Sequence, residues 1–398
     1  MTQTPTKYIH KIDKTMELLS KQRKAKLEAC ISLEHLVHNF NTVRAVTKSR
    51  ICCVIKADAY GHGAWQCART LAAAGADYFA VSSIAEAEEV RLALSDYGNS
   101  IGILILGYTL PTDADLLIRY NISQTVFSAE YAAALRDAIR DYKLDGILPQ
   151  DAALNIHIKI DTGMNRLGFS ADDTDSILAL GGIRDFRVEG IFTHFAQADT
   201  PASPMTEAQF SAFTGALDTL AANGMRPPLR HACNSAAITN FPQMHLDMVR
   251  YGIALYGLAP SAETALLPVK PVMTLKTVIS HIHTVKAGTP IGYGAAYTPD
   301  RDIRVATLPI GYADGFIRAY AEGGSVTIRG CAAPICGRIC MDQCMVDVTG
   351  IEDARIGDEV LLFGAGAPSA DDIAARAGTI GYEVLCLIGK RVPRVYTK

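Results

Sequence analysis

The chain alternates between short runs of β-branched or aromatic residues and longer alanine-rich stretches. A short apolar run bounded by turn residues is typical of a buried strand, whereas apolar residues three and four positions apart indicate one face of an amphipathic helix. Glu86–Leu94 and Ala129–Asp141 have the helical pattern. The strand pattern occurs at eight places: Ile51–Lys56, Asp77–Ser83, Ile101–Gly107, Gln124–Phe127, Leu154–Ile160, Val188–Phe195, Pro228–Asn234 and Asp247–Leu255.

The order of these elements predicts the fold class. Eight strand–helix units over about 210 residues match a (β/α)8 barrel of the TIM type, whose parallel strands are joined by right-handed crossovers. The main alternative is a doubly wound open sheet, which would carry a glycine fingerprint such as G-x-G-x-x-G at the start of its first helix. No such motif follows Ile51–Lys56. The sequence therefore favours an α/β protein with a TIM-type barrel.

Beyond Pro260 the helical spacing fades, and alternating runs broken by Gly, Pro and Asp follow one another. This pattern predicts a mainly antiparallel β domain. Its strands are expected at Val272–Val285, Arg304–Leu308, Ser325–Ile328, Met345–Val348 and Glu359–Phe363. We therefore expect an N-terminal extension at residues 1–25, a barrel at residues 26–260 and a C-terminal β domain at residues 261–398, with a linker at Ala259–Pro271.

Composition argues against several classes of function. A chain of 398 residues with 49% hydrophobic content can bury large cores, and a net charge of -3 gives no support to nucleic-acid binding. The most basic stretch, Lys21–Lys26, is short enough to be a solvated helix face. Apolar runs such as Ile101–Leu106 have strand length and are too short to span a membrane. The N-terminus has no signal-peptide pattern, so we expect a cytoplasmic protein.

Ten cysteines in a chain of this size, without a secretory signal, indicate free thiols in a reducing compartment. Four of them lie close together in the run CAAPICGRICMDQC: Cys331, Cys336, Cys340 and Cys344. Zinc and iron–sulfur sites usually contain tight C-x-x-C pairs, which this run lacks. We therefore expect short strands around Gly337 and no metal site.

The most informative stretch is VIKADAYGHG, residues 54–63, in which Lys56 stands between an apolar run and a glycine-containing turn. A lysine at the buried end of a strand is desolvated, and desolvation lowers the pKa of the amine and frees it to attack an aldehyde. A solvated lysine that ends an edge strand is the alternative. Position alone does not decide between the two.

Further polar side chains fall at or near the carboxyl ends of the predicted strands, where such barrels carry their chemistry. A single histidine on a strand is more often a structural core residue. Several polar residues that converge on one barrel mouth are harder to explain in that way. They are Lys159, Asp161, His194, His231, Asn234 and Arg250.

The loops after the seventh and eighth predicted strands have the features of a phosphate site. Barrels often bind a phosphate there, because exposed backbone N–H groups and a helix N-terminus favour an anion. Ser235 can donate a hydroxyl at a helix start, and Gly252 lets the backbone come close to a ligand. An ordinary helix cap and an ordinary loop glycine are the alternatives.

The stretch VIKADAYGHG resembles the cofactor-lysine motif of the alanine racemase family, which carries pyridoxal 5'-phosphate (PLP). Further stretches, which also resemble motifs of that family, follow in the family's order, and the resemblance covers residues 26–398. They are KIDTGMNRLGF (159–169), THFAQAD (193–199), NSA (234–236), RYGIALYG (250–257), GYGAAYT (292–298), GYADGF (311–316), CMDQ (340–343) and GYE (381–383). The resemblance implies a PLP-dependent racemase of alanine, built as a barrel plus β domain, which works as a head-to-tail homodimer with shared active sites and supplies D-alanine for peptidoglycan.

The resemblance also implies roles for single residues. Lys56 would hold PLP and act as one catalytic base, and Tyr293 of the partner subunit would be the other. Arg250 would face the pyridine nitrogen, and His194 and His231 would belong to a hydrogen-bonded chain that reaches it. The remaining positions implied to contact the cofactor are Tyr60, Asn234, Ser235, Gly252, Ile253 and Tyr382. Those implied for the substrate carboxylate are Arg166 and Met341, with Asp342 beside them, and Lys159 matches a position that is often carbamylated to orient Arg166.

These roles are chemically coherent. Removing the α-proton of an amino acid is slow because the carbanion is unstable, and the cofactor ring takes up its charge. Inversion then requires that the proton leaves one face and returns on the other, which an amine and a phenol on opposite faces can do. An arginine at the ring nitrogen does not give up its proton readily, so the ring stays unprotonated.

Two positions depart from the commoner wording of the family, and three alternatives remain. Asn165 stands where many members have a glycine, and Ile380-Gly381 precedes Tyr382 where an asparagine is common. The first alternative is a racemase of broader specificity, for serine or other amino acids, because sequence does not size the pocket around Met341. A PLP decarboxylase would need a cysteine base such as Cys344, and a PLP carrier protein would not need the β domain.

Overall fold

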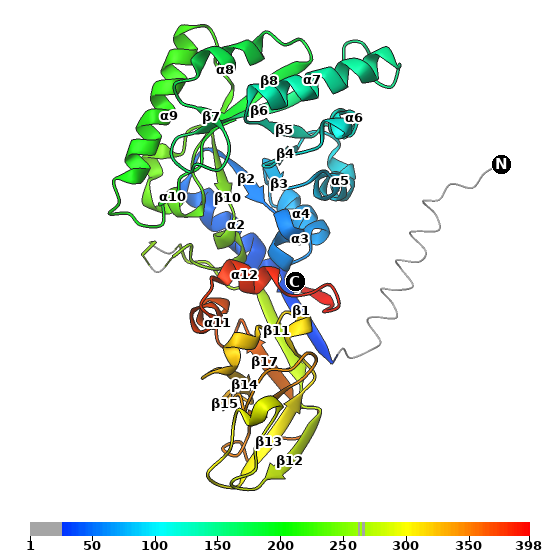
Figure 1. Ribbon diagram of the computed structural model, residues 1–398, viewed down its shortest axis with the longest axis vertical. Coiled ribbons are helices and arrows are strands. Elements are labelled where there is room, and N and C mark those ends of the chain that lie inside the picture. The colour runs from blue at the N-terminus through cyan, green and yellow to red at the C-terminus, as the bar shows by residue number, and fades with distance from the viewer. Residues whose placement is uncertain (1–25, 262, 265–266) are drawn as a thin grey trace, which may run out of the picture. The chain divides into compact units, whose positions relative to one another are not determined.

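The structure is a computed structural model that describes residues 26–261, 263–264 and 267–398. The expected N-terminal extension, residues 1–25, and part of the expected linker lie outside the described residues. The described chain forms two compact units (Figure 1). One is Ser32–Val272, and the other combines residues 26–31 with Met273–Thr397.

The first unit is a nearly closed barrel of eight parallel strands, counted over the described residues, and the predicted fold class is confirmed. In spatial order the strands are β10 (Met248–Tyr251), β2 (Arg50–Val54), β3 (Tyr78–Val81), β4 (Gly102–Ile105), β5 (Ser123–Val126), β6 (Leu154–Asp161), β8 (Phe186–Phe192) and β9 (Leu229–His231). A short strand, β7 (Phe169–Ser170), pairs with β6 outside this order. Between β9 and β10, Asp247 N–H donates to the Arg230 carbonyl and Arg250 N–H to that of Cys233, at 3.0 Å each.

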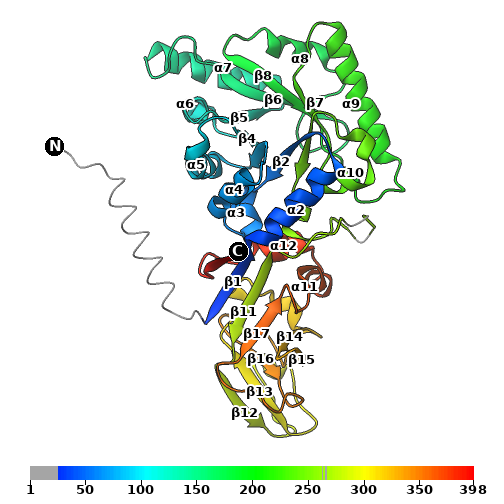
Figure 2. The same cartoon turned by 180° about the vertical axis from the view of Figure 1, so that it is seen from behind.

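Helices cover the outside of the barrel, as Figures 1 and 2 show. They are α2 (Leu33–Val46), α4 (Ala64–Ala73), α5 (Ile84–Ala93), α6 (Ala114–Arg119), α7 (Ala129–Leu144), α8 (Thr174–Gly181), α9 (Met205–Ala222) and α10 (Ser235–Asn240), with 3-10 turns at Ser95–Tyr97, Pro111–Asp113, Pro242–Met244 and Ile253–Tyr256. The segment labelled α3 (Lys56–Gly61) has non-helical backbone angles and forms a turn. Side-chain caps explain several of the helix starts. Ser83 and Ser128 accept hydrogen bonds from the N–H groups of Glu86 and Tyr131.

The turn that follows β2 has an uncommon backbone. Residues Ala57–Tyr60 all have φ of 52–54°, the left-handed region, although none of them is glycine. This conformation costs about 1–2 kcal/mol per residue. Polar contacts hold it in place: Glu86 Oε1 accepts from Ala57 N–H, and Asp58 Oδ1 accepts from Ala64 N–H, each at 2.7 Å. The sequence motif therefore encodes a left-handed turn that begins at Lys56 and is held by these hydrogen bonds.

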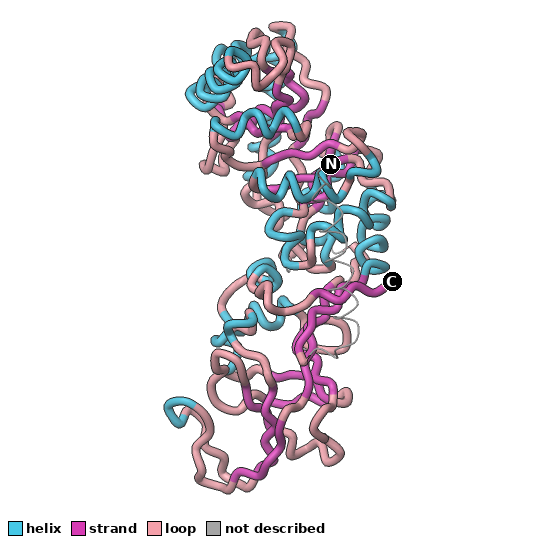
Figure 3. Tube along the Cα trace, turned by 90° about the vertical axis from the view of Figure 1, so that its right-hand side faces the viewer, coloured by secondary structure: helices cyan, strands magenta, loops and turns pink. Residues whose placement is uncertain are grey.

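The second unit is mainly antiparallel β structure, and Figure 3 shows strands and loops through most of it. A six-stranded sheet has the order β15 (Cys331–Pro334), β14 (Ser325–Ile328), β17 (Glu359–Phe363), β11 (Met273–Val278), β1 (Leu27–Ser32) and β18 (Arg394–Thr397), and a three-stranded sheet has the order β12 (His281–Val285), β13 (Ile303–Leu308) and β16 (Cys344–Asp347). Two helices follow late in the chain, α11 (Ala370–Ala377) and α12 (Gly381–Cys386). A small core forms around Val285, Ile303 and Val305.

The strand β1 connects the start of the described chain to the second unit. Its residues Leu27–Ile31 pair antiparallel with Thr277–Met273 of β11. The boundaries expected from the sequence, residues 26–260 and 261–398, remain a proposal about how the chain divides into domains. In the part of the chain that the structure describes, each helix is too short or too polar to cross a bilayer.

Candidate active site

Arg250 is the centre of the polar cluster in the barrel. It lies on β10 and is 3% exposed. Its Nη1 donates to His231 Nδ1 at 2.7 Å, and its Nη2 lies 3.0 Å from His194 Nδ1. Nη2 also reaches the carbonyls of Thr193 and Ala232 at 2.8 and 2.9 Å. Burial lowers the pKa of Arg250 to about 10, which leaves the guanidinium charged at neutral pH.

Positive charges gather at the carboxyl end of the barrel. Burial comes first among the causes that lower the pKa of His194 well below its usual range, and the charges of Arg250, Arg166, Lys159 and Lys56 follow in that order. His194 is therefore a neutral imidazole that lies among four basic side chains. A barrel mouth with this electrostatic potential favours anionic ligands such as phosphates and carboxylates.

Lys159 is the most buried of these lysines, at 3% exposure. Its Nζ donates to the Ile160 carbonyl at 2.6 Å and lies 5.7 Å from the centroid of the Phe192 ring. Burial lowers the pKa of Lys159 to about 8; the charge of Asp161 raises it, and those of Arg250 and Arg166 lower it. A substantial fraction of this amine is therefore neutral and nucleophilic near pH 7 to 8.

A second cluster forms where the sequence predicted a phosphate site. Gly252 N–H donates to Ser235 Oγ at 2.9 Å. A Cβ at position 252 would lie 3.2 Å from the Tyr60 hydroxyl and 3.7 Å from Ser235 Oγ, so the three residues surround one small space. Ile253 is buried beside them, and Asn234 caps α10 by accepting from Ala237 N–H at 3.0 Å.

The remaining predicted residues lie on the second unit. Tyr293 begins the short turn Tyr293–Ala295 and is 72% exposed. Met341 is exposed, Asp342 forms an ion pair with Arg391 at 2.6 Å, and Tyr382 lies half-buried in α12. The structure therefore brings the barrel residues together and places these four on a separate unit.

Two of the predicted motifs of the second unit come together through a residue that sequence reasoning missed. Arg391 lies 2.6 Å from Asp314 of GYADGF and 2.6 Å from Asp342 of CMDQ. Ala313 N–H also donates to the Met341 carbonyl at 3.0 Å. A lone arginine near the end of the chain carried no sequence signal for this role.

Asn165 also has a structural explanation. Its φ is 55°, in the left-handed region, where glycine is the usual residue and asparagine the best tolerated alternative. The Asp161 carboxylate accepts hydrogen bonds from Gly163, Met164 and Asn165 N–H groups at 2.9, 2.9 and 3.1 Å. Asparagine in place of the family's usual glycine at position 165 is therefore compatible with the turn that precedes Arg166.

Comparison with known proteins agrees with this architecture. Residues 31–260 match the alanine racemase N-terminal domain, and residues 272–396 match the alanine racemase C-terminal domain. The chain is 42% identical to the alanine racemase of Desulfovibrio desulfuricans over 372 residues, covering 92% of this chain and 97% of that one. It is similar to the solved alanine racemase of Clostridium difficile 630, with a TM-score of 0.88 and 39% identity over 94% of this chain and 97% of the other. A Bacillus anthracis alanine racemase solved with bound L-Ala-P has a TM-score of 0.85 and 31% identity, over 94% and 96% of the two chains.

The relatives that share this barrel and antiparallel β domain are amino-acid isomerases. The chain belongs to the alanine racemase family. Its activity is accordingly that of an isomerase, an alanine racemase.

Proposed function

We propose that the chain binds PLP at the carboxyl end of its barrel and interconverts L- and D-alanine by a two-base mechanism. The observation that carries this proposal is the state of Arg250. Within the described part of the chain, the Nε of this buried guanidinium has no hydrogen-bond partner, while both of its Nη atoms are fixed. Such an N–H suits a ligand that presents a neutral nitrogen acceptor, as an unprotonated pyridine does.

The barrel residues fit the other groups of the same cofactor. Lys56 would hold it through the ε-amine. Ser235, Tyr60 and the backbone at Gly252 would take its phosphate, because a Cβ at position 252 would fill the space that they surround. In the same proposal Asn234, Ile253 and Tyr382 complete the cofactor site, and His194 contacts Nη2 of Arg250 while His231 accepts from Nη1.

When bound, the cofactor takes up the negative charge that forms as the α-proton leaves the amino acid. The residues of the chain manage that proton. Lys56 Nζ takes it from one face of the substrate, and the phenol oxygen of Tyr293 of the partner subunit delivers one to the other face. In the opposite direction the two residues exchange roles, so one site converts both enantiomers.

The substrate carboxylate would lie against Arg166 and the backbone of Met341, with Asp342 beside them. Tyr293 and Met341 are exposed on their own unit, as residues that complete a site formed with a second copy would be. We therefore propose a homodimer with two shared sites. The reaction would take place in the cytoplasm and supply D-alanine for peptidoglycan, and the room around Met341 would decide whether serine is also accepted.

The covalent attachment of the cofactor gives the first test. Borohydride reduction of the purified protein, followed by peptide mapping, is expected to place the pyridoxyl label on Lys56, because Lys159 is 3% exposed and its amine is engaged with a backbone carbonyl. Lys159→Met serves as the matched control and should leave the labelled peptide unchanged. A label on Lys159, or a protein without absorption in the visible range, would contradict the proposal.

Lys159 itself is expected to carry a carbamate. Its neutral amine attacks CO2, the new N–C bond forms, and the amine releases one proton, which leaves a carboxylate able to orient Arg166. A pKa of about 8 makes about a tenth of the amine neutral at pH 7. The expected observation is one carbon resonance after incubation with 13C-bicarbonate, absent in Lys159→Met and lost on acidification. A spectrum of the wild-type protein without that resonance would show that Lys159 stays an amine.

A further inference from the structure

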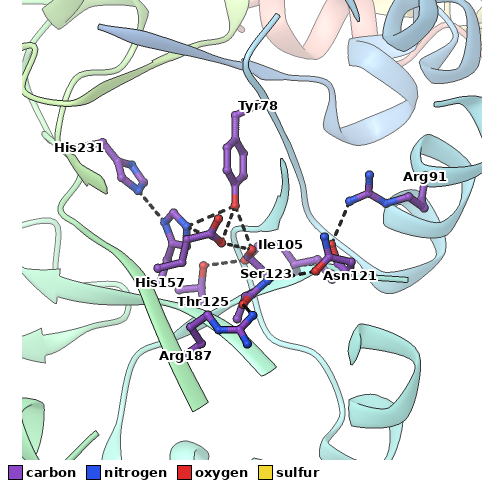
Figure 4. A network of polar contacts seen from close by, with 11 residues as sticks. Tyr78, Arg91, Ile105, Asn121, Ser123, Thr125, His157, Arg187 and His231 are labelled. Carbon is purple, nitrogen blue, oxygen red and sulfur yellow. Dashed lines mark hydrogen bonds and ion pairs between the residues drawn. The ribbon is translucent and has the colours of Figure 1, made fainter. Parts of the chain in front are cut away.

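Beyond Arg250 and His231, a line of polar side chains continues through the interior of the barrel. Barrel interiors of this type are usually filled by branched apolar residues. Here strands β3, β5, β6, β8 and β9 each contribute a polar group, and Figure 4 shows Tyr78, Ser123, His157 and His231 within this network. The remaining member, from β8, is Glu189.

The contacts form a continuous path from Arg250 to Glu189. Beyond the Arg250–His231 bond, His231 Nε2 lies 2.9 Å from His157 Nδ1. The other ring nitrogen of His157, Nε2, lies 3.4 Å from the Tyr78 hydroxyl oxygen and 3.5 Å from Glu189 Oε2. Both nitrogens of both imidazoles therefore face a partner.

Glu189 is an anion that several donors stabilise. Its Oε2 accepts from the Tyr78 hydroxyl at 2.9 Å and from Ser123 Oγ at 2.5 Å. Burial raises the pKa of Glu189, but hydrogen bonds from His157 and from the hydroxyls of Ser123 and Tyr78 lower it, and the pKa lies below its usual range. At neutral pH this end of the path is therefore a carboxylate, which can only accept hydrogen bonds.

The other end of the path fixes where every proton lies. A guanidinium has no acceptor, so His231 Nδ1 must be unprotonated in order to accept from Arg250. The proton of neutral His231 is then on Nε2 and points at His157 Nδ1. That nitrogen must in turn accept, which places the proton of His157 on Nε2, toward Glu189 Oε2 and the hydroxyl oxygen of Tyr78, which itself donates to Glu189.

The same reasoning excludes a charged His157, although an imidazole beside a carboxylate is ordinarily a strong candidate for protonation. A proton on Nδ1 of His157 would face the N–H of His231. Relieving that contact would require His231 to move its own proton to Nδ1, where it would face Arg250. Only one arrangement satisfies both ends: all hydrogen bonds run from Arg250 toward Glu189.

Two local features show that the fold accommodates this path. In the pairing of β6 with β8 the register shifts between Ile156 and His157, and Glu189 is the extra residue on β8. Such a bulge re-aims a side chain. The next residue is Gly190, where a Cβ would lie 2.4 Å from His157 Nδ1, the atom that accepts from His231. Any larger residue there would displace the imidazole.

We propose that His157 and Glu189 are positioning residues for Arg250, which they hold through a one-way relay of hydrogen bonds that ends on the Glu189 carboxylate. No acidic residue of the described chain pairs directly with this buried guanidinium, and the relay gives it a distant counter-charge through two neutral imidazoles. The effect on catalysis rests on the proposed function, in which Arg250 faces the ring nitrogen. The arrangement of protons along the relay does not depend on the proposed function.

Nitrogen NMR of histidine-labelled protein tests the relay directly, both as purified and after removal of the bound cofactor. His231 and His157 are expected to be neutral at pH 7 with the proton on Nε2 in both samples, and single His→Asn variants assign their resonances. A proton on Nδ1 at either residue, or a doubly protonated His157, would overturn the proposal. Because the cofactor-free sample gives the same readout, a failure of the relay is separable from a failure of the proposed function.

Variants at position 157 test whether the relay acts on Arg250. His157→Asn keeps an oxygen that can accept from His231, whereas His157→Leu removes the acceptor and leaves the N–H of His231 unpaired. We expect His231 to keep its proton on Nε2 in the asparagine variant and to lose this preference in the leucine variant. The racemisation rate should change in the same way. We expect kcat to fall about tenfold in His157→Leu at unchanged KM, and to stay close to the wild-type value in His157→Asn.

Removing the charge of Glu189, at the end of the relay away from Arg250, gives a second measurement. This measurement does not require that His157→Leu folds. Glu189→Gln is expected to lower kcat severalfold without changing KM, and Glu207→Gln, which removes an exposed carboxylate on α9, controls for charge alone. Equal kcat values for the three proteins, wild type, Glu189→Gln and Glu207→Gln, would show that Glu189 does not act on Arg250. A rise in KM at constant kcat would contradict the positioning role as well.

Discussion

Mixing two inactive variants, Lys56→Ala and Tyr293→Phe, is expected to restore about a quarter of wild-type activity if each site takes one base from each subunit. Each variant alone lacks one of the two groups that move the α-proton, so each should lose about 10²- to 10⁴-fold in kcat. Random reassociation of equal amounts makes half of the dimers mixed. In a mixed dimer both substitutions fall in one site, and the other site is intact.

The measurement is a racemisation assay by circular dichroism after dissociation and reassociation of the two proteins. Subunit exchange is shown independently with differently tagged chains. A matched control mixes Lys56→Ala with itself, which should stay inactive under the same treatment. If exchange is demonstrated and no activity returns, both bases come from one chain, and the proposal of shared sites is wrong.

The barrel could be predicted from the sequence because its strands are short, mostly apolar and largely buried. All eight predicted runs overlap the observed strands, and the run at Ile51–Lys56 overlaps β2 (Arg50–Val54). The prediction was less complete in the second unit. It missed β1, which precedes the barrel in the chain and finds its partner β11 almost 250 residues later. Local pattern carries no information about a pairing of that sequence separation.

The site was predictable only where a motif marked it. Ser235, Gly252 and Tyr60 each belong to a distinctive stretch and lie close together in the structure, and their role in binding a cofactor stays a prediction. His157 and Glu189 were missed. Both stand in runs that look like ordinary strands, and their role depends on a register shift between β6 and β8 that no periodicity reveals.

Replacing Arg250 by glutamate is expected to change which reaction the protein catalyses. The guanidinium stays charged at neutral pH and cannot readily give up a proton, so a ring nitrogen that it faces remains unprotonated. A carboxyl group in its place can share a proton with that nitrogen. We expect an altered visible spectrum, a fall of about 10²- to 10³-fold in racemisation, and a larger share of side transamination, measured as pyruvate formed from alanine.

The same substitution should reverse the proton arrangement of the relay. A carboxylate at position 250 accepts rather than donates, so His231 is expected to carry its proton on Nδ1, where nitrogen NMR detects it. Arg250→Lys is the matched control, since it keeps a positive donor while losing the fixed pair of Nη contacts. It should slow racemisation without raising the share of transamination. An Arg250→Glu protein with an unchanged spectrum and an unchanged ratio of racemisation to transamination would show that Arg250 does not control the protonation of the ring nitrogen.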